Sequence, residues 1–188
     1  MAKGVALLVL DMQNDIVNFH GKDEHLTRLI ANIKDLASWA RAHDIPVIHS
    51  RVAFRAGYID APSHHVPLLR ERGILDETLP GSWFIEELAP QQGDITLPPR
   101  RRVSAFYNTD LEVVLRRLQV HTLLFTGMST ARVVESTARD ASDRDYRAVV
   151  VTDGCSADTR EKHENALKSI ADFFGELMTI DAVKKAFA

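Results

Sequence analysis

The chain has little of what marks secreted, disulfide-bonded or membrane proteins. Cys155 is the only cysteine among 188 residues, so no internal disulfide can form and a secreted disulfide scaffold is excluded. The first apolar run, within "MAKGVALLVLD", is too short for a signal peptide or a membrane helix and ends on an aspartate. We therefore expect a cytoplasmic protein with no membrane partner.

The chain also has no excess of charge of either sign. The formal net charge is −3, and charged residues make up 26% of the sequence, which favours neither nucleic acid nor an anionic membrane as a partner. The one basic cluster, Arg100–Arg102, lacks the interleaved aromatics of a nucleic-acid-binding stripe. It is instead expected to be solvated or to face a site. The length fits one domain, residues 1–188.

Continuous apolar runs predict strands that are buried on both faces. The four clear ones are "GVALLVLD" (4–11), "IPVIHS" (45–50), "TLLFTG" (122–127) and "RAVVVTDG" (147–154). Weaker candidates are "GDITLPP" (93–99) and "LMTI" (177–180). The sequence thus predicts a sheet of about six strands.

Helical patterns separate these runs. Apolar residues fall on one face at 3.6-residue spacing over 23–41. Two further helices are predicted by capping-box pairs, Thr109 with Glu112 and Asp158 with Glu161. Strands that alternate with helices predict an α/β fold, with helices on both faces of a parallel sheet.

The stretch 52–98 breaks this alternation. It is rich in glycine and proline and contains only short helical pieces. A long irregular excursion from an α/β sheet is usually functional, so we predict that it covers a site.

Ligands of open α/β sheets bind beyond the carboxyl ends of the strands. Asp11 stands there directly after six apolar residues, and is either a helix cap or a partly buried acid/base with a raised pKa. Asp15, at helical spacing from Asp11, is expected to be structural.

The turn Gly127–Thr130 leads from a predicted strand into a helix, where an anion or a developing oxyanion is favoured. Either Ser129 or Thr130 is a candidate nucleophile or a candidate helix N-cap, and the N-cap role is favoured. One glycine in the turn excludes a phosphate-binding P-loop or a dinucleotide fingerprint. Cys155 is predicted to be a buried, inert thiol rather than a nucleophile. His64 and His65 are predicted to lie on the surface rather than to bind a metal.

With these motifs in view, the chain resembles the isochorismatase-like (cysteine hydrolase) family. The resemblance runs nearly end to end, through "LLVLDMQNDIV", "VIHSRVAFRAGY", "RVSAFYNTDLE", "GMSTARVVESTARDA" and "RAVVVTDGCSAD". It implies a Rossmann-like three-layer α/β/α sandwich around a mostly parallel sheet. It also implies a homodimer or larger homo-oligomer, with the site near subunit contacts.

By this resemblance, active members of the family have an Asp–Lys–Cys triad. This chain matches the triad at one residue. Asp11 stands at the aspartate position, Arg100 at the lysine position and Val133 at the cysteine position. Valine cannot act as a nucleophile, so the resemblance argues against cysteine-dependent amidase action. Arg100 stays protonated and would bind an anion rather than shuttle protons. Isochorismatases proper also lack the cysteine, which leaves room for acid/base catalysis with water.

The resemblance also implies an oxyanion hole at Met128, Ser129 and Thr130, with a cis peptide between the first two. Three aromatic residues are expected either to line the substrate pocket or to pack in the core; they are Trp83, Phe106 and Tyr107. The metal-site pattern of the nicotinamidase branch falls near Val52 and Phe54, neither of which is a ligand, so no metal and no cofactor is expected.

Two functional hypotheses follow. The first is a hydrolase that acts on a small anionic organic molecule without a cysteine nucleophile, with Asp11 as the acid/base and Arg100 as the anion clamp. The second is a non-catalytic relative that kept the pocket as a small-molecule-binding or scaffold protein.

Overall fold

The computed structural model describes residues 4–21 and 23–188 and contains a six-stranded parallel sheet. The strand order is β3-β2-β1-β4-β5-β6, and every neighbouring pair is parallel. The strands are β1 (Val5–Leu10), β2 (Val47–Ser50), β3 (Ile95–Thr96), β4 (Thr122–Met128), β5 (Arg147–Ser156) and β6 (Glu176–Met178). The order reverses between β1 and β4, the point at which ligands of such sheets bind.

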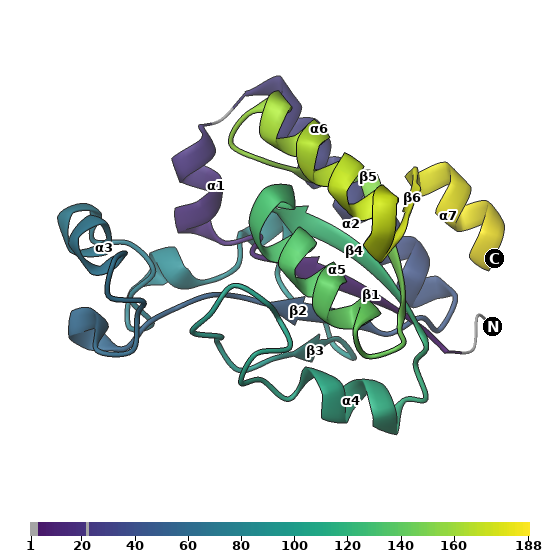
Figure 1. Ribbon diagram of the computed structural model, residues 1–188, viewed down its shortest axis with the longest axis horizontal. Coiled ribbons are helices and arrows are strands. Elements are labelled where there is room, and N and C mark those ends of the chain that lie inside the picture. Colours follow the sequence, from purple (N-terminus) through teal and green to yellow (C-terminus); the bar gives the residue numbers. More distant parts are fainter. Residues whose placement is uncertain (1–3, 22) are drawn as a thin grey trace.

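Helices cover both faces of the sheet, giving three layers (Figure 1). Apolar residues of α1, α2 and α7 pack on one face, and those of α4, α5 and the end of α6 pack on the other. The α-helices are α1 (Asn14–His20), α2 (Glu24–Ala42), α3 (Val66–Arg72), α4 (Leu111–Arg117), α5 (Glu135–Ser142), α6 (Arg160–Ser169) and α7 (Ile180–Phe187). Short 3₁₀ helices η1 (Ala56–Tyr58), η2 (Pro80–Ser82) and η3 (Glu86–Leu88) and π-helical turns η4 (Thr130–Val134) and η5 (Ile170–Phe174) complete the set.

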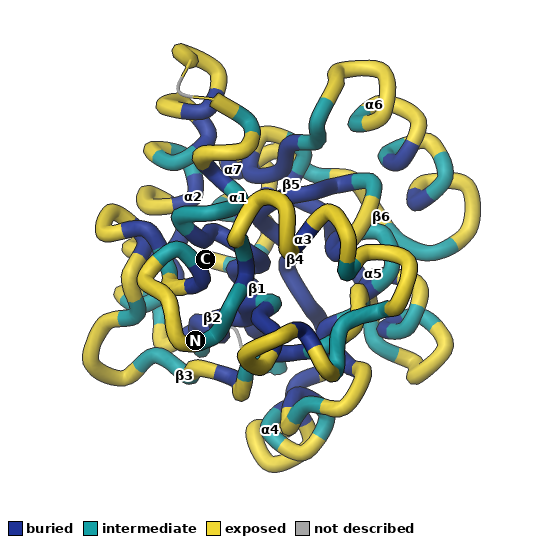
Figure 2. The backbone as a smooth tube through the Cα atoms, turned by 90° about the vertical axis from the view of Figure 1, so that its left-hand side faces the viewer, coloured by how far each residue is buried: buried dark blue, intermediate teal, exposed yellow. Residues whose placement is uncertain are grey.

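The central strands are apolar throughout because both of their faces are buried. In β1, Val5, Leu7 and Val9 belong to the core cluster under α2 and α7, whereas the residues between them belong to the cluster under α4 and α5. The strands accordingly form the buried centre of Figure 2, with exposed segments around them. This confirms the predicted α/β fold, including the two weak strands at the sheet edges.

Neither predicted capping box forms in full. The Thr109 hydroxyl accepts from the Leu111 amide at 3.2 Å at the start of α4, as predicted, but Glu112 pairs with Arg116 one turn later instead of reaching back. Helix α6 is capped by Thr159, whose hydroxyl accepts from the Lys162 amide at 3.2 Å. The predicted cap of α6, Asp158, is instead occupied by ion pairs with side chains of neighbouring segments.

The excursion at 52–98 carries η1, α3, η2 and η3 and leads into β3. Much of it, including α3, lies beyond the carboxyl ends of the strands (Figure 1). The side-chain amide of buried Gln13 donates to the carbonyls of Val52 (2.8 Å) and Ser82 (2.7 Å), and these hydrogen bonds hold two points of the excursion in place. Asp15 accepts from the Leu75 amide at 2.7 Å, which confirms its structural role.

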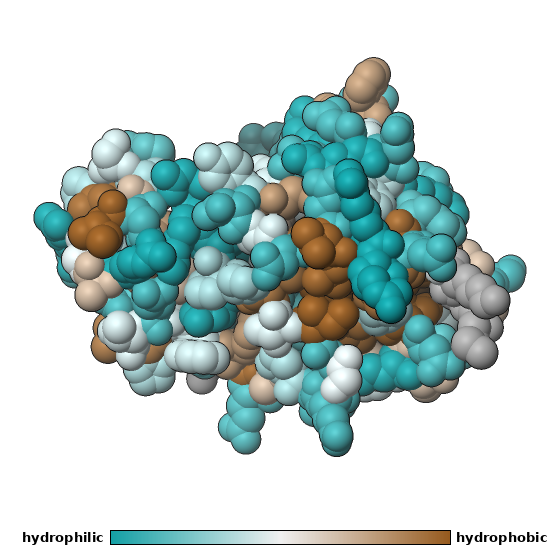
Figure 3. Space-filling model, turned by 90° about the horizontal axis from the view of Figure 1, so that it is seen from below, coloured by the Kyte–Doolittle hydropathy of each residue, from teal (hydrophilic) through white to brown (hydrophobic). Residues whose placement is uncertain are grey.

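The face seen from below in Figure 3, where α4 lies, is mostly polar but gathers apolar side chains in one area. On α4 itself, Val113 is 71% exposed. Among the residues described, no helix is long and apolar enough to span a bilayer.

Candidate functional site

Asp11 lies at the carboxyl end of β1, at the point where the strand order reverses. Its amide donates to the Ser50 carbonyl at 2.9 Å, which holds it beside the end of β2. Its backbone is in the left-handed region, with φ of 55°, a conformation that residues other than glycine adopt infrequently. The chain therefore turns sharply at the carboxylate as it leaves the sheet.

Arg100 reaches Asp11 from the segment after β3. Its amide donates to the Arg51 carbonyl at 3.0 Å, and its Nε donates to the Val103 carbonyl at 2.9 Å. The two Nη atoms donate to the two carboxylate oxygens of Asp11, one to each. Such a fork-to-fork pair is directional as well as electrostatic.

This ion pair is almost inaccessible to solvent. Asp11 is 5% exposed and Arg100 is 2% exposed. Burial raises the pKa of Asp11 because it penalises the charged form, and the nearby Arg100 guanidinium opposes that rise. The helix-cap alternative is wrong, because the carboxylate of Asp11 binds Arg100. The burial of Asp11 and the direction of its pKa agree with the other alternative, and its role as an acid/base stays a prediction.

The turn after β4 lies next to Asp11. Gly127 is the register partner of Leu10, the residue before Asp11. Its φ is 118°, and a Cβ there would lie 1.9 Å from the Leu10 carbonyl oxygen, so only glycine fits. The peptide that follows, Met128–Ser129, is cis, as the family resemblance predicts.

Ser129 and Thr130 are both buried. Ser129 stands at the N-cap position of η4, but its side chain makes no capping hydrogen bond. The Thr130 hydroxyl lies 2.8 Å from Nδ1 of His163 on α6. The N-cap prediction is confirmed for the position of Ser129, although its hydroxyl does not bind the amides that follow, and it is wrong for Thr130, which lies inside η4.

Val133 lies within the π-helical turn η4 and is 1% exposed. Turns of this kind are frequent at functional sites. The Thr137 hydroxyl donates to the Val133 carbonyl at 2.5 Å and accepts from the Ala105 amide at 3.0 Å. Thr137 thereby ties the segment that follows Arg100 to the turn that carries Val133.

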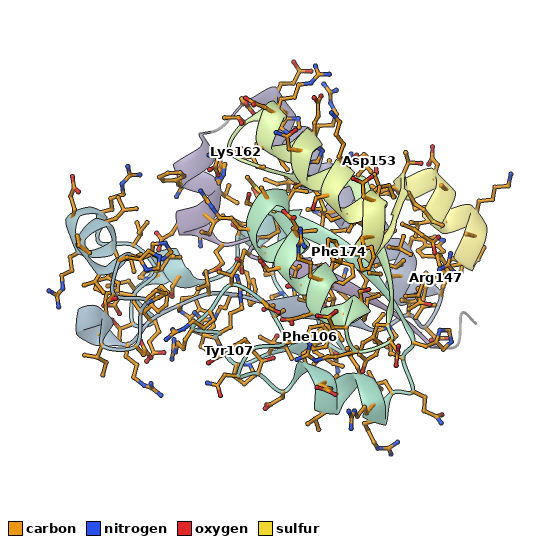
Figure 4. All side chains as sticks on the ribbon, viewed as in Figure 1. Phe106, Tyr107, Arg147, Asp153, Lys162 and Phe174 are labelled. Carbon is orange, nitrogen blue, oxygen red and sulfur yellow. The ribbon has the colours of Figure 1, made fainter. Side chains whose placement is uncertain are left out.

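The three candidate aromatic residues lie in different environments. Phe106 is 7% exposed and stacks on Tyr146 with ring centroids 5.8 Å apart, as a core residue does. Tyr107 is 59% exposed and lines a surface cavity (Figure 4). Trp83 is half exposed, and the Arg51 guanidinium lies over its ring at 4.3 Å. Of the three, Tyr107 is thus placed at a cavity wall.

That cavity has a volume of about 550 Å³ and an arginine-rich lining. Arg101 and Arg102 follow Arg100 directly in the chain, although neither Arg100 nor Asp11 lines the cavity. Three arginines face one aspartate, which gives the wall a net positive charge. The full lining is Arg55, Asp60, Arg101, Arg102, Tyr107 and Asn108. Two residues of the basic cluster at 100–102 thus face a cavity. The sequence had pointed to Asp60 only as a possible metal ligand beside the two histidines, and not to Arg55 or Asn108.

Cys155 is a buried free thiol. It pairs with Gly127 across β4 and β5, and its Sγ lies 3.4 Å from the Phe125 carbonyl, to which it donates. Burial raises its pKa, so the thiolate is disfavoured. The prediction of a buried thiol is confirmed.

The two adjacent histidines were predicted to lie on the surface rather than to bind a metal. His64 and His65 are exposed and lie side by side, with ring centroids 4.0 Å apart. Within residues 4–21 and 23–188, no group of three or more His, Cys, Asp or Glu side chains is arranged to hold a metal ion.

Comparison with known proteins identifies the relationship. The Isochorismatase domain family matches residues 5–182. The chain belongs to the isochorismatase family of hydrolases. It is 35% identical to ureidoacrylate amidohydrolase RutB of Stutzerimonas stutzeri, across 100% of this chain and 84% of that protein. It is 32% identical to the uncharacterized isochorismatase family protein YecD of Escherichia coli O157:H7, across 98% and 97%.

Solved structures of the isochorismatase family agree with the fold. An isochorismatase family protein from Desulfovibrio vulgaris superposes with a TM-score of 0.90 at 33% identity, covering 98% of each chain. A cysteine hydrolase from Pseudomonas syringae also gives 0.90, at 28% identity, covering 100% of this chain and 93% of that one.

Proposed function

We propose that this isochorismatase-family protein hydrolyses a small organic anion without a cysteine nucleophile. The observation that carries the proposal is the buried Asp11–Arg100 pair beside the Met128–Ser129 turn, where the strand order of the sheet reverses. The arginine-lined cavity, whose Arg101 follows Arg100 in the chain, supports an anionic substrate. The name of the RutB relatives specifies an acrylate, which is also a carboxylate.

In this proposal Val133 stands where the family resemblance places the nucleophile, so water must supply the attacking oxygen. With an ester, Asp11 accepts a proton from water as the water oxygen bonds to the acyl carbon. With a vinyl ether, the protonated carboxyl first donates its proton to the terminal vinyl carbon and then takes one back from the water that adds to the resulting oxocarbenium carbon. The same carboxyl then delivers that proton to the leaving oxygen, so that H and OH are added across the broken C–O bond. The raised pKa of Asp11 suits a group that must both take and release a proton.

Arg100 keeps its charge at any working pH and binds anions bidentately. In the proposal it holds Asp11 in place, while the donors that the Met128–Thr130 turn presents stabilise developing negative charge on the substrate. Cys155 takes no part, because its thiol is buried and donates to the Phe125 carbonyl.

A second candidate function is a non-catalytic, ligand-binding member of the family. The observation that favours it is that Arg100 occupies both oxygens of Asp11. In addition, Val133 lies within an apolar core cluster rather than beside a cavity. A protein with this arrangement would bind a small anion and not turn it over.

One experiment separates the two. The purified protein is incubated with a panel of small anionic vinyl ethers, esters and amides, and product formation is measured alongside thermal stabilisation by each compound. The hydrolase proposal expects turnover of at least one ester or vinyl ether, abolished in Asp11→Asn and retained in Cys155→Ser. Stabilisation by an anion with no turnover of any compound would support the binding protein instead.

A further inference from the structure

A second cavity lies between the beginnings of α2 and α6, and its lining includes Met128 of the turn after β4. Its volume is about 290 Å³. Figure 4 separates the two regions, since Lys162 marks the first turn of α6 at one side of the view and Tyr107 of the arginine-lined cavity lies at the other. The lining is His20, Asp23, His25, Leu26, Met128, Ser156, Ala157, Asp158, Thr159, Arg160 and His163.

The carboxylates of this cavity already have donors. One oxygen of Asp158 accepts from Nε2 of His20 at 2.9 Å. The other accepts from Arg132 at 2.6 Å and from Lys162 at 3.0 Å. Asp23 accepts from a backbone amide at the start of α2. The charge of Asp158 is therefore compensated by cations within the protein, and one oxygen of Asp23 is satisfied by a backbone amide.

Two histidines of the cavity wall are hydrogen-bonded to buried hydroxyl groups. The hydroxyl of Thr130 lies 2.8 Å from Nδ1 of His163, and that of Ser156 lies 2.9 Å from Nε2 of His25. Each hydroxyl can either donate to its imidazole or accept from it. An oxyanion in the cavity would select the tautomers in which the hydroxyls donate, because the other ring nitrogens, Nε2 of His163 and Nδ1 of His25, then carry the protons that it accepts.

Arg160 adds a charge to these donors. Its Nε donates to Glu164 at 2.6 Å, which leaves its Nη groups without a partner in the part of the chain that the structure describes. Leu26 and Met128 supply an apolar part of the wall. The carboxylates of the wall are already hydrogen-bonded, whereas the Nη groups of Arg160 have no partner among the described residues and are free to donate. Together with the apolar part of the wall, this fits a ligand that has an oxyanion at one end and a short carbon chain.

We propose that this cavity is a second ligand site, for a small oxyanion carried by a carboxylate or a phosphate group. Its volume is at the lower end for ligand pockets, roughly 300–1,000 Å³, so the ligand is of small-metabolite size. The site touches the turn after β4 through Met128 and through the Thr130–His163 hydrogen bond. It is separate from the Asp11–Arg100 pair and does not depend on the proposed hydrolysis.

The test is isothermal titration calorimetry of the full chain with sodium succinate and with inorganic phosphate, with succinamide as the neutral analogue. Binding of succinate, phosphate or both is expected, with succinamide at least tenfold weaker than succinate. The substitutions Arg160→Gln and His25→Ala, both at exposed positions, are expected to weaken anion binding at least tenfold. Arg117→Gln, an exposed arginine on α4 that lines neither cavity, is the matched control and is expected to bind as the wild type does.

A ¹⁵N spectrum of the histidine side chains supplies a second readout, because succinate is expected to shift the signals of His25 and His163. Absence of binding by both anions would overturn the proposal, as would binding that Arg160→Gln leaves unchanged. Binding that Arg102→Gln removes would also overturn it, since Arg102 lines the other cavity. Asp11→Asn should bind succinate normally, so failure of the hydrolase proposal remains distinguishable from failure of this one.

Discussion

Replacing Arg100 by methionine tests the buried ion pair on which the candidate site is built. The substitution keeps much of the side-chain volume but leaves the Asp11 carboxylate without the donors that both of its oxygens now use. Both partners are at least 94% buried, so solvent cannot replace the lost guanidinium. Removing one partner of such a pair costs about 3–5 kcal/mol of folding free energy.

The double variant Asp11→Asn/Arg100→Met provides the control for this value. It removes the buried charge and leaves a polar amide that lacks partners, which costs about 1–3 kcal/mol. We therefore expect the double variant to be more stable than Arg100→Met alone, by roughly 2 kcal/mol. Urea unfolding followed by the fluorescence of the two tryptophans, Trp39 and Trp83, measures all three free energies.

The folding free energy that Arg100→Met loses should also depend on pH. Burial raises the pKa of Asp11, so the folded state holds that proton more tightly than the unfolded chain, where aspartate titrates near about 3.9. The stability that this group contributes is fully present below that value and declines as pH rises through the folded pKa. Without Arg100 the pKa rises further and the decline extends to higher pH. Arg100→Met should therefore lose more stability at pH 8 than at pH 5.

Two outcomes would refute this reasoning. One is an Arg100→Met variant within about 1 kcal/mol of the wild type at pH 8, below the cost of a broken buried pair. The other is a double variant that is less stable than the single one, which would mean that Asp11 is not a buried unpaired charge when Arg100 is absent.

Three further predictions address the surroundings of the pair. Cys155 should react with a thiol reagent such as DTNB only after unfolding in urea, because burial raises its pKa; rapid labelling of the native protein would contradict this. Thr137→Val should cost about 1–3 kcal/mol in urea unfolding, since it leaves the buried Ala105 amide without its acceptor; Thr137→Ser, which keeps the hydroxyl, should restore most of the loss. Gly127→Ala should yield little folded protein by circular dichroism, because its Cβ would lie 1.9 Å from a backbone oxygen; a wild-type melting temperature would show that β1 and β4 can separate there.

The fold was predictable because it depends on repeated, local patterns. Continuous apolar runs identify strands buried on both faces, and even the two-residue β3 and three-residue β6 follow from weak runs. Helix ends were harder to predict. Asp158 has the residue type and spacing of a cap, yet its carboxylate is occupied by His20, Arg132 and Lys162 from distant or neighbouring segments. Sequence spacing alone does not reveal such competition.

The sequence predicted which residues of the candidate site lie at the same edge of the sheet, but it predicted few of the contacts that their side chains make. Asp11 and Arg100 are 89 residues apart, and strand-end reasoning with the family resemblance brought both to one edge of the sheet. The distribution of Phe106 and Tyr107 between core and cavity wall was open, because adjacent residues in an irregular segment point in directions that no periodicity fixes. The Thr137 link was missed for a related reason, since a threonine inside a helical pattern gives no sign of its partner in another segment.

The proposed function requires the residues that the family resemblance places at the triad positions to be physically consistent with one another. A thiolate nucleophile needs an accessible position and a neighbouring group that exchanges protons. Val133 is packed into the apolar cluster beneath α5, and Arg100 does not release its proton at working pH. In the proposal, Asp11 is therefore the residue of these three that exchanges a proton, and its pKa is raised by the same burial that excludes water from the pair. Hydrolysis by this route requires that Arg100 release at least one oxygen of Asp11, and a negatively charged substrate would favour this release by competing for the guanidinium.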